Sequence, residues 1–172
     1  MAVPPSDMQQ NFSSLLQSRE GTDVVFRVRG ATFAAHRCVL AARSSVFRSL
    51  VFGPKKEGPS STASDVQIEE VFEAMLGFIY GDLLTMPSVV KDEGVLVQHL
   101  LVAADRYDLR RLKLMCANKL CAHIGMDTAK TILALAEKHG CDGLQNSWDF
   151  DHLCRSCPSV MKCIVLAMLP AK

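Results

Sequence analysis

The residue types best suited to chemistry in this sequence are the cysteines and histidines near its carboxyl end. Cys154 and Cys157 form a Cys-x-x-Cys pair, and the other possible ligands around it are His139, Cys141, His152 and Cys163. Thiolates and imidazoles bind zinc, but a strong prediction of a zinc site needs a second close pair at regular spacing. These ligands are irregularly spaced, and Cys163 falls within an apolar helical pattern. We therefore interpret them as thiols and imidazoles of the core or surface, and expect neither a metal site nor a cofactor.

No pattern of residues predicts catalysis. The five histidines show no spacing that pairs one with a nucleophile, and there is no glycine loop that could bind phosphate. His36 opens a predicted helix, and a single histidine without a partner motif is more often a structural residue with a hydrogen-bonded ring. The sequence favours a protein that is not an enzyme.

Length and charge narrow the class of protein further. A chain of 172 residues can form one ordinary domain with a small appendage. Its net charge of +1, with bases scattered among acids, favours neither nucleic acid nor a membrane surface as a partner. No run approaches the roughly 20 apolar residues of a membrane span, and the first residues lack a signal-peptide pattern. Seven cysteines without regular spacing suit reduced thiols, so we expect a location in the cytoplasm, the nucleus or both.

Residues 23–44 form the central stretch of the chain, and their pattern predicts a β-hairpin followed by a helix. Val24, Phe26 and Val28 alternate with residues of a second face, and Gly30 supplies a turn. After Phe33 the apolar period lengthens to about three and a half residues, which predicts a small-residue helix buried on most sides.

A helix is also predicted before the hairpin, with Ser6 or Asp7 as its cap and Gly21 as its end. Its apolar stripe consists of Met8, Phe12, Leu15 and Leu16. Taken alone, this stripe fits either packing on its own domain or packing on a second copy of the chain.

The remaining patterns make the chain a helix-rich α/β mixture. They predict helices over residues 44–53, 69–81, 92–107, 108–120, 127–140, 141–149 and 158–169, with a third short strand over 65–68. The predicted caps are Ser44 or Ser45, Asp92 or Glu93, Asp108, and Asp127 or Thr128. Residues 55–64 form a polar connector rich in Gly, Pro and Ser.

The hairpin and the run from His36 to Ser44 resemble the BTB (POZ) domain. Residues 71–73, 78–80, 101–107 and 112–113 are similar to that family's later helices. The resemblance is greatest to the BTB half of plant MATH-BTB proteins, without their MATH domain. It implies an α+β fold with a short three-stranded sheet flanked by helices. We expect an N-terminal dimerisation helix in residues 1–20, the BTB/POZ domain in 21–123 and a shortened helical BACK-like extension in 124–172.

The resemblance also implies a partner for the first helix. In the family this helix lies across the two-fold axis of a homodimer, and Met8, Phe12 and Leu15 match the positions that meet there. Asp23 and Arg37 match residues that line a charged pocket near the dimer interface. Without the resemblance, Asp23 would simply cap a turn and Arg37 would be solvated, and the two interpretations stay open. The expected partner is a second copy or a related BTB protein.

Cullin-3 is the second partner that the resemblance implies, with Phe47, Leu50, Lys55, Glu57 and Tyr107 at the expected contact. Family members that bind cullin-3 carry a hydrophobic-x-Glu element in the loop that corresponds to residues 55–57. Here Glu57 is kept, but Lys55 stands at the apolar anchoring position, which disfavours a tight fit. Two hypotheses follow: an adaptor of a cullin-3 ubiquitin ligase, or a module that only pairs with full-length MATH-BTB relatives.

Overall fold

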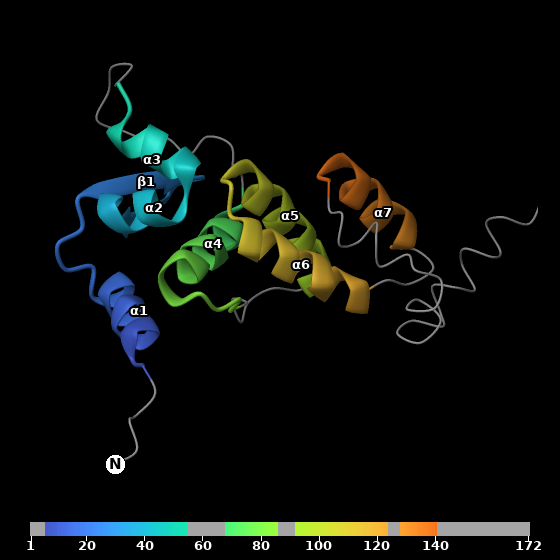
Figure 1. Ribbon diagram of the computed structural model, residues 1–172, viewed down its shortest axis with the longest axis horizontal. Helices are drawn as coiled ribbons and strands as arrows, with labels where there is room; N and C mark the ends of the chain where they lie inside the picture. The colour runs from blue at the N-terminus through green and yellow to red at the C-terminus, as the bar shows by residue number, and fades with distance from the viewer. Residues whose placement is uncertain (1–5, 55–67, 86–91, 124–127, 141–172) are drawn as a thin grey trace, which may run out of the picture.

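The computed structural model describes residues 6–54, 68–85, 92–123 and 128–140 of the chain. In these residues seven helices accompany one two-stranded antiparallel sheet. Helix α4 (Glu69–Gly81) lies between α1 (Met8–Ser18) on one side and the pair α5 (Glu93–Arg106) and α6 (Arg110–Ala122) on the other (Figure 1). The architecture is the helix-rich α/β mixture that the sequence predicts. No described helix is long and apolar enough to cross a membrane.

The predicted hairpin forms from β1 (Val24–Val28) and β2 (Ala31–Ala35). Val24 pairs with Ala35 and Val28 with Ala31, so only Arg29 and Gly30 make the turn. Both have positive φ angles, 48° and 108°, as a tight hairpin turn requires. The valines and Phe26 of β1 face the core in strict alternation. Residues 65–67 of the expected third strand lie outside the described residues.

The helix after the hairpin, α2 (Arg37–Arg43), is shorter and more exposed than the sequence suggested. Ala35 still belongs to β2, and α2 buries only Val39, Leu40 and Ala41. The Ser44 hydroxyl accepts a hydrogen bond from the Phe47 amide at 3.0 Å, which caps α3 (Ser45–Phe52) as predicted.

The core is centred on α4, whose apolar residues are almost all buried. The ring of Phe72 contacts Phe26 and Phe33 of the hairpin, with centroids 5.4 and 5.1 Å apart. Glu69 and Glu70 occupy the first turn of α4, where the helix dipole favours acids. This helix therefore joins the hairpin to α5.

Helix α1 rests on α4 through part of its surface. A side chain at Gly81 would place its Cβ only 2.7 Å from the Ser13 hydroxyl, so glycine allows the two helices to approach closely. Leu16 packs against the core, but no side chain of α1 is fully buried. The helix ends earlier than predicted, because Arg19, two residues before Gly21, takes the left-handed conformation that closes it.

The last described elements form a hairpin of helices and one added helix. Asp92 caps α5 through the Val95 amide at 3.2 Å, as predicted. The prediction that Asp108 caps α6 is wrong, because Leu109 holds the cap position and Asp108 accepts a hydrogen bond from Ser45 of α3. Helix α7 (Ala129–Lys138) places Ile132 and Ala136 in the core. The predicted helices 141–149 and 158–169 lie outside the described residues.

Candidate functional site

A largely apolar groove of about 670 Å³ opens between α1, α2 and α4. Met8 and Phe12 of α1 line it, and their side chains are 63% and 38% exposed. Its other lining residues are Ser6, Gln9, Cys38, Val39, Ala42, Arg43, Ile79, Tyr80 and Asp82. Large apolar side chains gathered in one groove are typical of a surface that another protein covers.

The groove is supported by a hydrogen-bonded pair, His36 and Tyr80. The His36 amide donates to the Tyr80 hydroxyl at 2.8 Å, and His36 Nδ1 lies 2.8 Å from the same oxygen. His36 Nε2 lies 2.7 Å from the Glu20 carbonyl, which can only accept, so Nε2 carries the proton. In the neutral ring Nδ1 then accepts from the Tyr80 hydroxyl. This arrangement satisfies every polar group of the pair and confirms the structural role predicted for His36.

Burial raises the pKa of the Tyr80 hydroxyl, although the hydrogen bond from the His36 amide opposes that effect. The phenol therefore stays neutral well above pH 7. A neutral phenol is the form that can accept from the amide and donate to the ring at once.

Asp23 and Arg37 do meet, but through the backbone of Arg37. Asp23 Oδ1 accepts a hydrogen bond from the Arg37 amide at 2.8 Å. This contact fixes the start of α2 against the start of β1, because a carboxylate satisfies one of the free amides of the first helical turn. The Arg37 side chain is half-buried and that of Asp23 is exposed.

Two arginines pair with Asp82, one of the residues that line the groove. Asp82, at the end of α4, pairs with Arg43 of α2 and with Arg111 of α6, the latter at 3.0 Å. The guanidinium of Arg43 also lies over the Phe78 ring, 5.5 Å from its centroid. This one carboxylate thus connects the end of α4 to α2 and to α6.

A second exposed apolar surface lies on α3. Leu50 and Phe52 are 42% and 59% exposed. Beneath them Phe47 is buried and its ring stacks on Tyr107, with centroids 4.5 Å apart and planes inclined by 19°. The Ser44 hydroxyl donates to the Tyr107 carbonyl at 2.5 Å. The aromatic pair and this hydrogen bond set the position of α3 on the domain.

Comparison with known proteins identifies the family. Residues 12–124, more than half of the chain, match the model of the BTB/POZ domain. This chain belongs to the BTB/POZ domain family.

Its similar relatives combine a BTB/POZ domain with a MATH domain. The chain is 37% identical to BTB/POZ and MATH domain-containing protein 3 of Arabidopsis thaliana. The alignment is 187 residues long and covers 94% of this chain and 45% of that protein. It is 35% identical to protein 4 of the same series, covering 92% of this chain and 39% of that protein. Protein 6 is also 35% identical, covering 84% and 38%. The chain therefore spans less than half the length of these BTB/POZ relatives.

Two of the predicted dimer contacts of this BTB/POZ chain line the groove, whereas Leu15, Asp23 and Arg37 do not. Met8 and Phe12 line the groove, Leu15 is half-buried on the same helix, and Asp23 touches the start of α2. The sequence analysis missed Cys38, Ala42, Ile79 and Tyr80 as groove residues. The spacing of Cys38 and Ala42, one helical turn apart, was the available signal.

The residues predicted to contact cullin-3 divide into two groups. Leu50 is exposed on α3, whereas Phe47 and Tyr107 have their side chains in the core. Because their side chains are buried, Phe47 and Tyr107 could affect cullin binding only indirectly, by holding α3 in position. Lys55 and Glu57 lie outside the described residues.

The cysteine chemistry stays unassigned. In the described ranges no three side chains of the metal-binding types come together, and Cys38, Cys116 and Cys121 form no disulfide. The Cys154 and Cys157 pair and its neighbours lie outside those ranges, except for His139, whose Nδ1 donates to Asp105 Oδ2 at 2.9 Å.

Proposed function

We propose that this BTB/POZ chain is a dimerising adaptor in a cullin-3 ubiquitin ligase, acting in protein ubiquitination. The groove between α1, α2 and α4 carries the proposal, because Met8 and Phe12 remain exposed beside a hollow of about 670 Å³. A second copy, or a related BTB protein, would bury these side chains at about 25 cal/mol for each Å² of apolar surface removed from water. The role needs no catalytic residue.

The exposed face of α3 supports the cullin contact. Leu50 and Phe52 offer apolar side chains that a partner can cover, and such anchors supply most of the binding energy of an interface. The stacked rings of Phe47 and Tyr107 hold this face in place. The three described cysteines form no disulfide, which suits the reducing cytoplasm or nucleus where we place this role.

One sequence feature favours an alternative role. Lys55 places an ammonium at the position where cullin-binding relatives carry an apolar anchor, and burying a charge against apolar surface weakens binding. In this alternative the chain is an oligomerisation module that pairs with full-length MATH-BTB relatives and binds cullin only weakly.

Light scattering of the full chain, alone and with the N-terminal domain of cullin-3, tests the adaptor role. We expect a dimer that takes up two cullin chains, and a Leu50→Asp variant that remains dimeric but loses them. Leu114→Asp is the matched control, since Leu114 is a similarly exposed leucine, 47% exposed, on α6. Lys55→Met should tighten the complex by restoring an apolar anchor.

If neither the natural chain nor the Lys55→Met variant binds cullin-3 as a dimer, the adaptor role is contradicted. The alternative, a module that only pairs with MATH-BTB relatives, would then stand. An equal loss of cullin-3 binding in the Leu50→Asp and Leu114→Asp variants would show that α3 is not the specific contact surface.

A further inference from the structure

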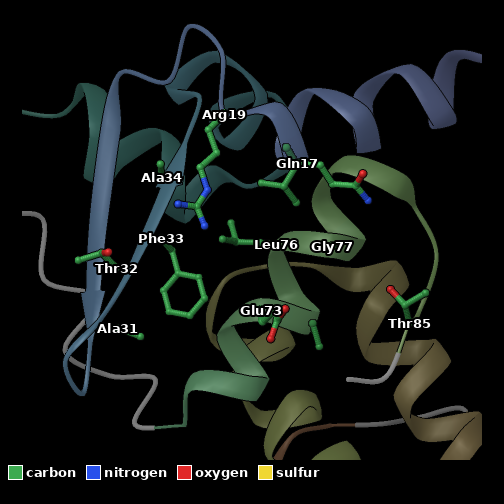
Figure 2. A pocket seen from close by; sticks show the side chains of 12 residues that line it. Gln17, Arg19, Ala31, Thr32, Phe33, Ala34, Glu73, Leu76, Gly77 and Thr85 are labelled. Atoms are coloured by element: carbon green, nitrogen blue, oxygen red, sulfur yellow. The ribbon is translucent and has the colours of Figure 1, made fainter. Parts of the chain in front are cut away.

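A second groove, of about 490 Å³, lies between β2, α4 and the end of α1. In Figure 2, Arg19 and Phe33 extend into the space between β2 and α4, and Leu76 and Glu73 project from α4. Its other lining residues are Leu16, Gln17, Ala31, Thr32, Ala34, Ala74, Gly77 and Thr85. None of them lines the groove with Met8 and Phe12.

Four consecutive residues of β2, from Ala31 to Ala34, line this groove. Successive side chains of a strand point to opposite faces of its sheet. A hollow that touches four in a row must therefore run along the edge of β2, where backbone amides and carbonyls face outward.

This edge is open in the described part of the sheet. There β2 pairs with β1 alone, in the order β1-β2. The two strands also differ in burial: β1 alternates strictly between buried and exposed, whereas Ala31 and Phe33 on the inward face of β2 are only half-buried. An unpaired strand edge beside half-covered apolar side chains is the geometry to which an extended peptide adds as a further strand.

Charged side chains stand at two places along the groove. Arg19 reaches in at the Ala34 end of β2, and Glu73 lies nearer the other end (Figure 2). Among the described residues neither makes an ion pair, and both are exposed. The groove thus presents a cation, an apolar floor formed by Phe33 and Leu76, and an anion.

We propose that this edge groove binds an extended segment of a partner protein as an added antiparallel strand. The segment carries an acidic side chain for Arg19 near its amino end, apolar side chains over Phe33, and a basic side chain for Glu73 near its carboxyl end. Antiparallel pairing gives this order, because β2 runs from Ala31 towards Arg19, and it is the more stable pairing per residue. The five residues of β2 span about 16 Å, enough for a segment of similar length. This site is independent of dimerisation and of cullin binding.

The probe is a fluorescein-labelled peptide, Glu-Thr-Val-Thr-Lys with blocked ends, whose Glu, Val and Lys share one face of a strand; it is titrated into the full chain and followed by fluorescence anisotropy. We expect saturable binding that weakens about tenfold in Arg19→Glu, where like charges would meet. Arg27→Glu is the matched control, since Arg27 is an exposed arginine on β1, outside the groove. The reversed peptide, Lys-Thr-Val-Thr-Glu, should bind the natural chain weakly and the Arg19→Glu, Glu73→Arg double variant well.

Backbone methylation tests strand addition directly. Peptides methylated on the amides of one edge should lose binding, while methylation of the other edge should leave it, because an added strand bonds along one edge only. Binding that survives both methylations, that is equal for the two peptide orders, or that is absent at millimolar peptide would overturn the proposal. A change of oligomeric state in Arg19→Glu would also overturn it, by assigning the groove to a second copy of the chain.

Discussion

The hydroxyl group of Tyr80, on α4, is hydrogen-bonded to His36, the residue that follows the hairpin. This hydroxyl accepts from the His36 amide and meets His36 Nδ1, both at 2.8 Å, while the Tyr80 ring lines the groove with Met8 and Phe12. Replacing the hydroxyl would leave two buried polar groups of His36 without a partner, and such groups are costly.

We expect Tyr80→Phe to lower the free energy of unfolding by about 1–3 kcal/mol, the cost of leaving buried donors or acceptors unpaired. Urea denaturation at pH 7 measures the difference. An unchanged free energy would mean that water replaces the hydroxyl.

The raised pKa of Tyr80 predicts an alkaline dependence of stability. Because the folded chain favours the neutral phenol, its contribution is fully present below the unfolded pKa of about 10 and is lost as the pH rises through the higher folded pKa. The stability difference between the natural chain and Tyr80→Phe should therefore shrink above about pH 10. A difference that stays constant up to pH 12 would assign the alkaline loss to other groups.

Among the elements, the hairpin depends on its turn. Gly30 has a φ of 108°, and a Cβ there would meet no atom within 4 Å, so only backbone strain opposes a side chain. Gly30→Ala should lower the free energy of unfolding by about 1 kcal/mol or more. Thr32→Ala, at an exposed position of β2, is the control and should change it by less than about 0.5 kcal/mol. Equal effects on urea denaturation would show that the turn is not strained.

Helices α5, α6 and α7 are joined by Asp105. It accepts from Lys113 Nζ at 2.6 Å and from His139 Nδ1 at 2.9 Å. Burial raises the pKa of Asp105, but these two hydrogen bonds outweigh it and hold the pKa below its ordinary value. The carboxylate form is thus the one that ties α7 to the BTB/POZ domain.

Asp105→Asn should lower the free energy of unfolding by less than about 1 kcal/mol at pH 7, since the side chain is 36% exposed and water screens the pair. A depressed pKa gives stability that is present above the unfolded pKa of about 3.9 and lost as the pH falls through the folded pKa. The difference from the natural chain should therefore begin to shrink as the pH falls below about 4 and vanish once the pH lies below the folded pKa. Glu137→Gln, an exposed acid of α7, should show no such trend in acid titrations followed by circular dichroism.

For the whole molecule, the proposed dimer depends on the first helix. Phe12→Asp should give monomers in light scattering, because a carboxylate buried in an apolar interface without a partner costs several kcal/mol. Gln10→Asp adds the same charge to an exposed position of α1 outside the groove and should stay dimeric. An unchanged mass for Phe12→Asp would show that α1 serves only its own domain.

The sequence by itself determined the features that depend on neighbouring residues. Alternation fixed the hairpin and the inward residues of β1, and the caps at Ser44 and Asp92 followed from side chains that reach amides three residues away. The family resemblance likewise rests on short runs, such as the one from His36 to Ser44, and the match over residues 12–124 confirms it.

Only the tertiary structure decided which faces meet. It turned Asp108 from a cap into a partner of Ser45, placed Phe47 and Tyr107 in the core, and left Cys38 and Ala42 exposed. It also brought Arg19 and Glu73, which are 54 positions apart in the chain, to one groove along β2. These outcomes depend on contacts between distant segments, and a local pattern of apolar residues shows that a face is buried without showing what covers it.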